Sequence, residues 1–170
     1  KMDGKLKIHA TAVALILFIL AAGNALGGSA VRKSVLYVSG FGVLAVLSLF
    51  FVFSIPMLLR WKRTPLTLFL LANRRWIGIY VFVFALIHIA LVFNFFFSWD
   101  ISKLLGNPNS LFLGLGTLSF LILAAMAATS TDWAMKTLGK HWKTLQNLAY
   151  VALVLILVHA FKIGLVFMSQ

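Results

Sequence analysis

The chain has 170 residues, of which 62% are hydrophobic and only 11% are charged. A water-soluble domain carries about 25% charged residues, so this composition and the mean hydropathy of +1.05 exclude an ordinary soluble globule, a disordered tail and a nucleic-acid-binding domain. The net charge of +12 fits an integral membrane protein, because the basic residues lie between long apolar runs. The absence of cysteine excludes disulfides, thiolate metal sites and cysteine nucleophiles.

Acidic residues are scarce as well. The three that exist, Asp3, Asp100 and Asp132, all fall outside the apolar runs. This placement argues against a catalytic pair of carboxylates and against a proton relay inside the membrane.

Five apolar runs reach the length of about 20 residues that a membrane helix needs. They cover approximately residues 9–26, 35–59, 76–97, 111–130 and 145–168. The connections are short, so the sequence predicts an all-α integral membrane protein, a five-transmembrane-helix bundle forming one domain over residues 1–170. The first run follows a basic tail, as in a signal peptide, but its length indicates a retained signal anchor.

The basic residues predict the orientation of the bundle. Eleven of them fall on one side, in the N-terminal tail, the second loop and the fourth loop: Lys1, Lys5, Lys7, Arg60, Lys62, Arg63, Arg74, Arg75, Lys136, Lys140 and Lys143. Four fall on the other side: Arg32, Lys33, Lys103 and Lys162. The positive-inside rule therefore places the N-terminus in the cytoplasm and the C-terminus outside. Five tryptophans at the predicted span ends agree with an interfacial belt: Trp61, Trp76, Trp99, Trp133 and Trp142.

Proline and glycine mark three further positions in the spans. Pro56 is expected to kink or end the second span near its inner end. The glycine pairs Gly40 with Gly42 and Gly114 with Gly116 have two interpretations, close helix packing or room for a flat cofactor, and packing is the more common one.

Two of the four histidines lie inside apolar runs. His9 and His141 are near the inner surface, where an interfacial position explains them. His88 and His159 are different, because an ionisable group inside a membrane span is costly and usually marks function.

The two histidines are expected at nearly the same depth, in the outer half of the bilayer. His88 comes 13 residues after Arg75, about 20 Å along a helix, and His159 comes 16 residues after Lys143, about 24 Å. Two imidazoles at equal depth on spans three and five suit a six-coordinate b-type haem, with one Nε2 on each face of the iron. The alternative is two buried neutral histidines, each hydrogen-bonded to a serine, a threonine or a backbone carbonyl. Zinc or copper is less suited, because a third ligand is missing.

Lys162 follows His159 by three residues and so shares its helix face. Its ammonium group could contact a haem propionate. The more common role of such a lysine is to extend toward the outer lipid headgroups.

Two segments carry a family resemblance. The first is TSTDWAMKTLGKHWKTLQNLAY from Thr129 to Tyr150, followed by His159, and the second is NRRWIGIY from Asn73 to Tyr80, leading to His88. Both resemble the ferric-reductase-like transmembrane family, and in particular its haem-binding membrane subunits of periplasmic reductase systems. The resemblance covers roughly residues 35–165.

The resemblance implies that His88 and His159 are the axial haem ligands. It also implies a b-type cytochrome that moves electrons from a flavin reductase or a quinol to an acceptor outside. A quinone is then a candidate for a further cofactor. Such a chain is an electron-transfer subunit rather than a complete enzyme.

One departure concerns a second haem. The family's haem-binding subunit has a further histidine 13 residues before the one in span five, where this chain has Gln146. The corresponding position before His88 is Arg75, which cannot bind iron, and His141 lies in the loop. We therefore expect one haem, and Gln146 leaves open whether another cofactor binds there.

A single haem in the outer half is far from a cytoplasmic donor. A membrane quinol or a cofactor on a partner subunit would close this gap. Four residues form a basic inner rim that suits an acidic donor, although topology and lipid headgroups explain the same charges: Arg74, Arg75, Lys140 and Lys143. The loop 98–110 would face the acceptor.

Two hypotheses follow. The first is a b-type cytochrome subunit with one haem ligated by His88 and His159, embedded in the lipid bilayer with protein partners as donor and acceptor. The second is an accessory subunit of a larger photosynthetic or respiratory complex, with the same scaffold and with reduced or lost redox activity. The membrane is a bacterial inner membrane in the first case and could be thylakoid-type in the second, and neither hypothesis involves nucleic acid.

Overall fold

The computed structural model describes residues 3–168, with side chains described through residue 164. Within these residues the regular structure is entirely helical. Five helical segments are long and apolar enough to cross a membrane: Gly4–Gly27, Ala30–Trp61, Pro65–Phe97, Ser110–Ala128 and Lys140–Gly164. The predicted all-helical fold and the predicted number of helices of membrane-spanning length are thus confirmed for the described residues. Lys1 of the basic tail and both ends of the predicted domain 1–170 lie outside the described residues.

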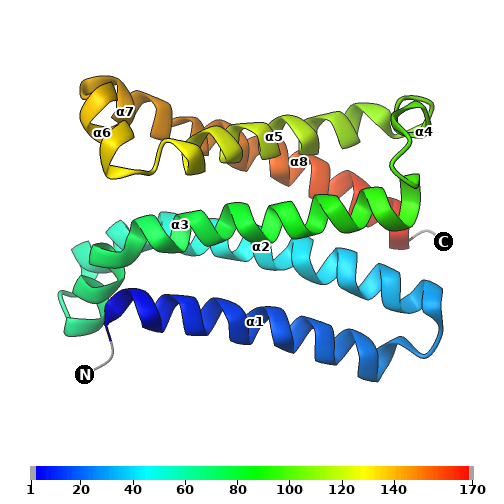
Figure 1. Ribbon diagram of the computed structural model, residues 1–170, viewed down its shortest axis with the longest axis horizontal. Coiled ribbons are helices and arrows are strands. Elements are labelled where there is room, and N and C mark those ends of the chain that lie inside the picture. Colours follow the sequence, from blue (N-terminus) through cyan, green and yellow to red (C-terminus); the bar gives the residue numbers. More distant parts are fainter. Residues whose placement is uncertain (1–2, 169–170) are drawn as a thin grey trace. The chain divides into compact units, whose positions relative to one another are not determined.

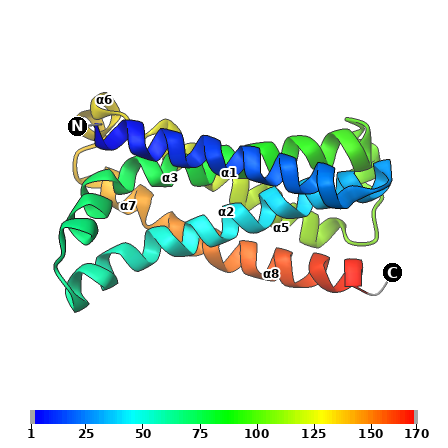
Figure 2. The same cartoon turned by 90° about the horizontal axis from the view of Figure 1, so that it is seen from below.

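The first unit, Lys1–Phe95, consists of three long helices that alternate in direction. They are α1 (Gly4–Gly27), α2 (Ala30–Trp61) and α3 (Pro65–Val92), and they lie side by side in both views (Figures 1 and 2). A core cluster of Ala12, Ala45 and Phe84 joins one residue from each helix. The α3 helix continues into the π-helical turn η1 (Phe93–Phe97).

The second unit, Phe96–Gln170, is built on a pair of long helices. The pair is α5 (Ser110–Ala128) and α8 (Leu148–Met168), with α6 (Asp132–Leu138) and α7 (Lys140–Gln146) at one end and α4 (Ile101–Leu105) at the other (Figure 1). Ser119 on α5 is 1% exposed, and its hydroxyl donates to the carbonyls of Leu115 and Ala152. The bond to Ala152 ties α5 to α8 at a position that is buried from water.

Capping residues explain where three helices begin. The side chain of Ser29 accepts a hydrogen bond from the backbone N–H of Arg32 at the start of α2. Thr64 and Thr67 form a reciprocal capping box at the start of α3, with Pro65 in the first helical turn. At the start of α6, the side chain of Thr131 accepts a hydrogen bond from the backbone N–H of Ala134. These side chains satisfy backbone N–H groups that have no partner within the first turn.

The helices of the first three spans are longer than the apolar runs that predicted them. The third span was expected from residue 76, but α3 begins at Pro65, so Arg74 and Arg75 lie within a helix instead of a loop. The apolar run measures only the hydrocarbon thickness, whereas the capping box at Thr64 sets the start of the helix. Pro56 does not end α2, which continues to Trp61.

Replacing Ser119 with leucine should destabilise the α5–α8 pair by about 1–3 kcal/mol, because the added volume has no space in a fully buried position. Thermal unfolding in detergent measures this loss. Leu118→Phe is the matched control, since Leu118 is 49% exposed, and it should change stability by less than about 0.5 kcal/mol. Equal effects of the two substitutions would contradict the packing described here.

Candidate functional site

His88 lies on α3 and is held by the backbone of α2. Its Nδ1 is 2.8 Å from the carbonyl oxygen of Val38, and its ring lies against Gly42. A carbonyl oxygen can only accept, so Nδ1 carries the proton and donates it. In the neutral imidazole, the lone pair is then on Nε2.

His159 lies on α8 and is held in the same way by α5. Its Nδ1 is 2.8 Å from the carbonyl oxygen of Phe112, and its ring lies against Gly116. The same reasoning assigns the proton to Nδ1 and the lone pair to Nε2.

The two histidine sites have the same arrangement of contacts, each within its own unit. A histidine that binds a metal through Nε2 commonly donates its other N–H to a carbonyl or a carboxylate, and this bond fixes the tautomer and the ring orientation. A buried neutral histidine would also use a carbonyl, so the bond belongs to both interpretations of the sequence. Within the described residues, no group of three histidine, cysteine, aspartate or glutamate side chains gathers to hold a metal ion.

Lys162 is exposed on α8, and its Nζ lies 5.4 Å from the centroid of the Phe112 ring. The same Phe112 supplies the carbonyl that His159 binds. Lys162 therefore lies close to the His159 site, as its spacing in the sequence predicts, and a propionate contact stays a prediction.

Gln146 lies on α7 and binds the end of α5. Its Nε2 donates to the carbonyl of Met126 over 3.3 Å, and nearby Trp142 donates from Nε1 to the carbonyl of Thr129 over 3.0 Å. Both bonds reach the last turn of α5, where backbone carbonyls have no partner within the helix. Trp142 and Gln146, both in the segment from Thr129 to Tyr150, thus fasten α7 to the end of α5.

His9 has a partner that the sequence analysis missed. Its Nδ1 is 2.7 Å from the hydroxyl of Tyr80, which ties α1 to α3. The His9 ring also meets Trp76 edge-on, with centroids 5.4 Å apart. Tyr80 and Trp76 both belong to the segment NRRWIGIY, and their spacing of four residues places them on one helix face. His141, by contrast, is exposed on α7.

Two cations lie near the Trp76 ring in the first unit, and one of them, Arg75, belongs to the predicted inner rim. The guanidinium carbon of Arg75 is 5.7 Å, and the Nζ of Lys5 is 5.3 Å, from the centroid of a Trp76 ring. In the second unit, Lys140 and Lys143 are exposed on α7.

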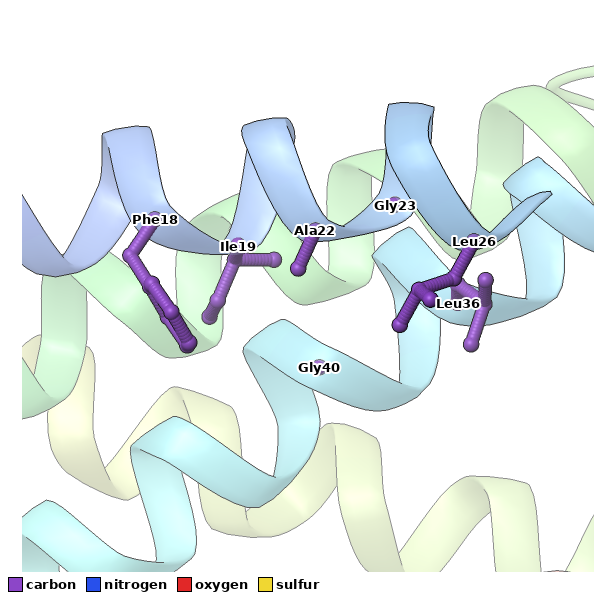
Figure 3. A pocket seen from close by; sticks show the side chains of 7 residues that line it. All are labelled: Phe18, Ile19, Ala22, Gly23, Leu26, Leu36 and Gly40. Carbon is purple, nitrogen blue, oxygen red and sulfur yellow. The ribbon is translucent and has the colours of Figure 1, made fainter.

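An apolar groove lies between α1 and α2. It has a volume of about 220 Å³ and involves neither histidine of the candidate site. Figure 3 shows its lining: Phe18, Ile19, Ala22, Gly23, Leu26, Leu36 and Gly40. None of these side chains is polar, so the groove offers no group that could orient a polar ligand.

The predicted acceptor-facing loop begins with an unusual backbone. Ser98 and Trp99 have φ angles of 51° and 60°, a conformation that costs free energy for residues other than glycine. Asp100 follows and caps α4, because its carboxylate accepts from the hydroxyl and the backbone N–H of Ser102. Both hydrogen bonds lower the pKa of Asp100, and the bond from the Ser102 hydroxyl has the larger effect.

The sequence profile described as "Ferric reductase like transmembrane component" matches residues 39–157. The chain belongs to this family, which confirms the resemblance seen in its sequence.

Similar proteins include the protein-methionine-sulfoxide reductase heme-binding subunit MsrQ of Salmonella paratyphi B, Salmonella newport and Salmonella heidelberg. Each is 35% identical over 104 residues, which are 60% of this chain and 51% of the relative. The chain thus spans about half the length of these curated relatives. No solved structure matches it.

The cap of α4 should depend on pH. Asp100 has a pKa below its ordinary value of 3.8, so the ionised carboxylate stabilises α4 fully above that value and loses this effect as pH falls through the lowered pKa. The amide proton shift of Ser102, followed by NMR during acid titration, reports the change. Asp100→Ala should abolish the transition, and a midpoint at or above 3.8 would contradict the assignment.

Proposed function

We propose that the chain is the membrane subunit of a b-type cytochrome and that His88 and His159 are the axial ligands of its one haem. The observation that carries the proposal is the pair of Nδ1–carbonyl bonds, each 2.8 Å long. They are the outer-shell bonds expected of ligands that bind iron through Nε2. The family and the MsrQ relatives, which are named as heme-binding subunits, support a haem-binding electron-transfer role.

The residues around each histidine fit a haem b. Bis-histidine ligation needs no cysteine, and the chain has none. Bound haem supplies one-electron exchange at its iron. The chain's own residues hold each imidazole in one tautomer, and the donated Nδ1 proton makes Nε2 a more basic ligand. The apolar faces of the spans limit water near the ligands.

The electrons would enter from a membrane quinol or a flavin donor and leave to an acceptor on the outer side. The distribution of lysine and arginine supports the orientation on which this direction depends, with a cytoplasmic N-terminus and an external C-terminus. The bacterial relatives favour an inner membrane and give no support to a thylakoid membrane. Because those relatives are named as subunits of a reductase, partner proteins are the expected donor and acceptor.

A second candidate is an accessory subunit of a larger membrane complex with reduced or lost redox activity. The position of Gln146 favours it, since the amide there binds the carbonyl of Met126 where the family's haem-binding subunit has a histidine. A buried histidine that binds only a carbonyl would also fit this role.

Replacement of either proposed ligand should remove the α-band of six-coordinate haem. The wild-type protein, purified in detergent with haem supplied, should show a b-type α-band in the reduced-minus-oxidised spectrum. We expect His88→Ala and His159→Ala to lose it, because one imidazole cannot maintain six-coordinate iron. His9→Ala and His141→Ala are the controls and should keep it. A well-folded wild type without the band would support the accessory subunit instead.

Replacing Gln146 with histidine should not create a second haem site. The counterpart before His88 is Arg75, which cannot bind iron, so only one imidazole would be available there. Haem and protein assays should give one haem per chain before and after the substitution. Two haems per chain in Gln146→His would contradict this expectation and would require another ligand near α7.

A further inference from the structure

Two glycines lie directly against the rings of His88 and His159. A Cβ atom built on Gly42 would be 2.9 Å from Nδ1 of His88, and one built on Gly116 would be 2.8 Å from Nδ1 of His159. Real Cβ atoms essentially never come this close to another atom. No other residue type therefore fits either position unless the imidazole moves.

Helix geometry explains why glycine is needed at these two positions. In an α-helix, the carbonyl of a residue accepts from the N–H four residues later and still has a second lone pair. The Cβ atom of that later residue tilts toward the helix N-terminus and so covers this lone pair. Gly42 follows Val38 by four residues, and Gly116 follows Phe112 by four. Each glycine thus exposes the carbonyl that its histidine binds.

The neighbouring glycines show that this contact is specific. A Cβ on Gly40 would meet Ile19 of α1, at 3.0 Å, and a Cβ on Gly114 would meet nothing within 4 Å. The two pairs look alike in the sequence, but only the second glycine of each pair contacts a histidine. Among the described side chains, each unit has one such arrangement of carbonyl, glycine and imidazole.

We infer that Gly42 and Gly116 are positioning residues that hold the two histidines with Nδ1 on a helix carbonyl and Nε2 as the iron ligand. The effect on haem rests on the proposed function, whereas the effect on the tautomer does not. Each carbonyl bond keeps its imidazole electron-rich, which stabilises ferric iron and lowers the midpoint potential. Both glycines would thereby influence the affinity and the potential of the haem through the two histidines.

Alanine substitution tests the inference with a matched control in each unit. Gly42→Ala and Gly116→Ala should weaken haem binding about 10- to 100-fold, the usual effect of losing an outer-shell partner, and should raise the midpoint potential of the haem that remains. The low-spin EPR signal should also shift, since it depends on the imidazole orientation. Gly78→Ala and Gly114→Ala should match the wild type, because a Cβ at either position has open space.

A second measurement uses the protein without haem. With ¹⁵N-labelled histidine, NMR distinguishes a proton on Nδ1 from a proton on Nε2. In the wild type, both His88 and His159 should carry it on Nδ1, with signals assigned from His88→Phe and His159→Phe. Gly42→Ala should change only the His88 signal, and Gly116→Ala only the His159 signal.

The outcomes separate the inference from the proposed function. A wild type that binds no haem but shows both Nδ1 tautomers would overturn the cytochrome and leave the positioning role supported. Nε2 protonation in the wild type, or unchanged tautomers in both alanine variants, would overturn the positioning role. Equal losses of haem affinity in Gly114→Ala and Gly116→Ala would overturn it too, because a general helix effect would then explain both.

Discussion

The second lone pair of a helix carbonyl is the group on which the candidate site depends. Inside a membrane, backbone groups must find partners within the protein, and a helix uses one lone pair of each carbonyl for its own bonds. Val38 and Phe112 offer the other lone pair to a histidine on the neighbouring helix. This bond turns an ionisable side chain that is costly in an apolar span into a neutral imidazole with a defined tautomer.

The remaining polar groups of the spans follow the same logic. Ser119 donates to a carbonyl of α8, His9 pairs with Tyr80, and Gln146 donates to the last turn of α5. Among the described residues, no buried side-chain nitrogen or oxygen lacks a hydrogen-bond partner. The helix pairs are therefore held by a few specific bonds together with close packing at small residues.

The sequence predicted the helices better than it predicted the partners. Five apolar runs were enough to identify five spans. An apolar run long enough to cross a bilayer forms a helix, because a helix satisfies its backbone hydrogen bonds internally. The start of α3 was missed, since the capping box at Thr64 lies outside the apolar run. The carbonyl partners could not be predicted from a single chain, because every residue has a carbonyl. The glycine pairs that contain Gly42 and Gly116 were visible in the sequence. Their contact with the histidines could be recognised only from the positions of the imidazole rings.

The family relationship and the local geometry support the function in different ways. The family match covers residues 39–157 and so includes His88, both glycine pairs and the helical connection before α8. The geometry shows how Nδ1 of each histidine is occupied by a carbonyl, so that the Nε2 lone pair is left to bind a metal. A match to a family does not show this. Gln146 shows why a ligand cannot be transferred by resemblance alone, since its amide donates a hydrogen bond to the carbonyl of Met126.

The central claim is that two histidine nitrogens bind one iron. Electron–nuclear double resonance on the ferric protein, labelled with ¹⁵N-histidine and compared with unlabelled protein, detects nitrogen atoms bound to that iron. The account predicts ¹⁵N couplings from two axial imidazoles in the wild type, with one lost in His88→Ala and the other lost in His159→Ala. A haem coupled to a single histidine nitrogen, or couplings that persist in both variants, would contradict it.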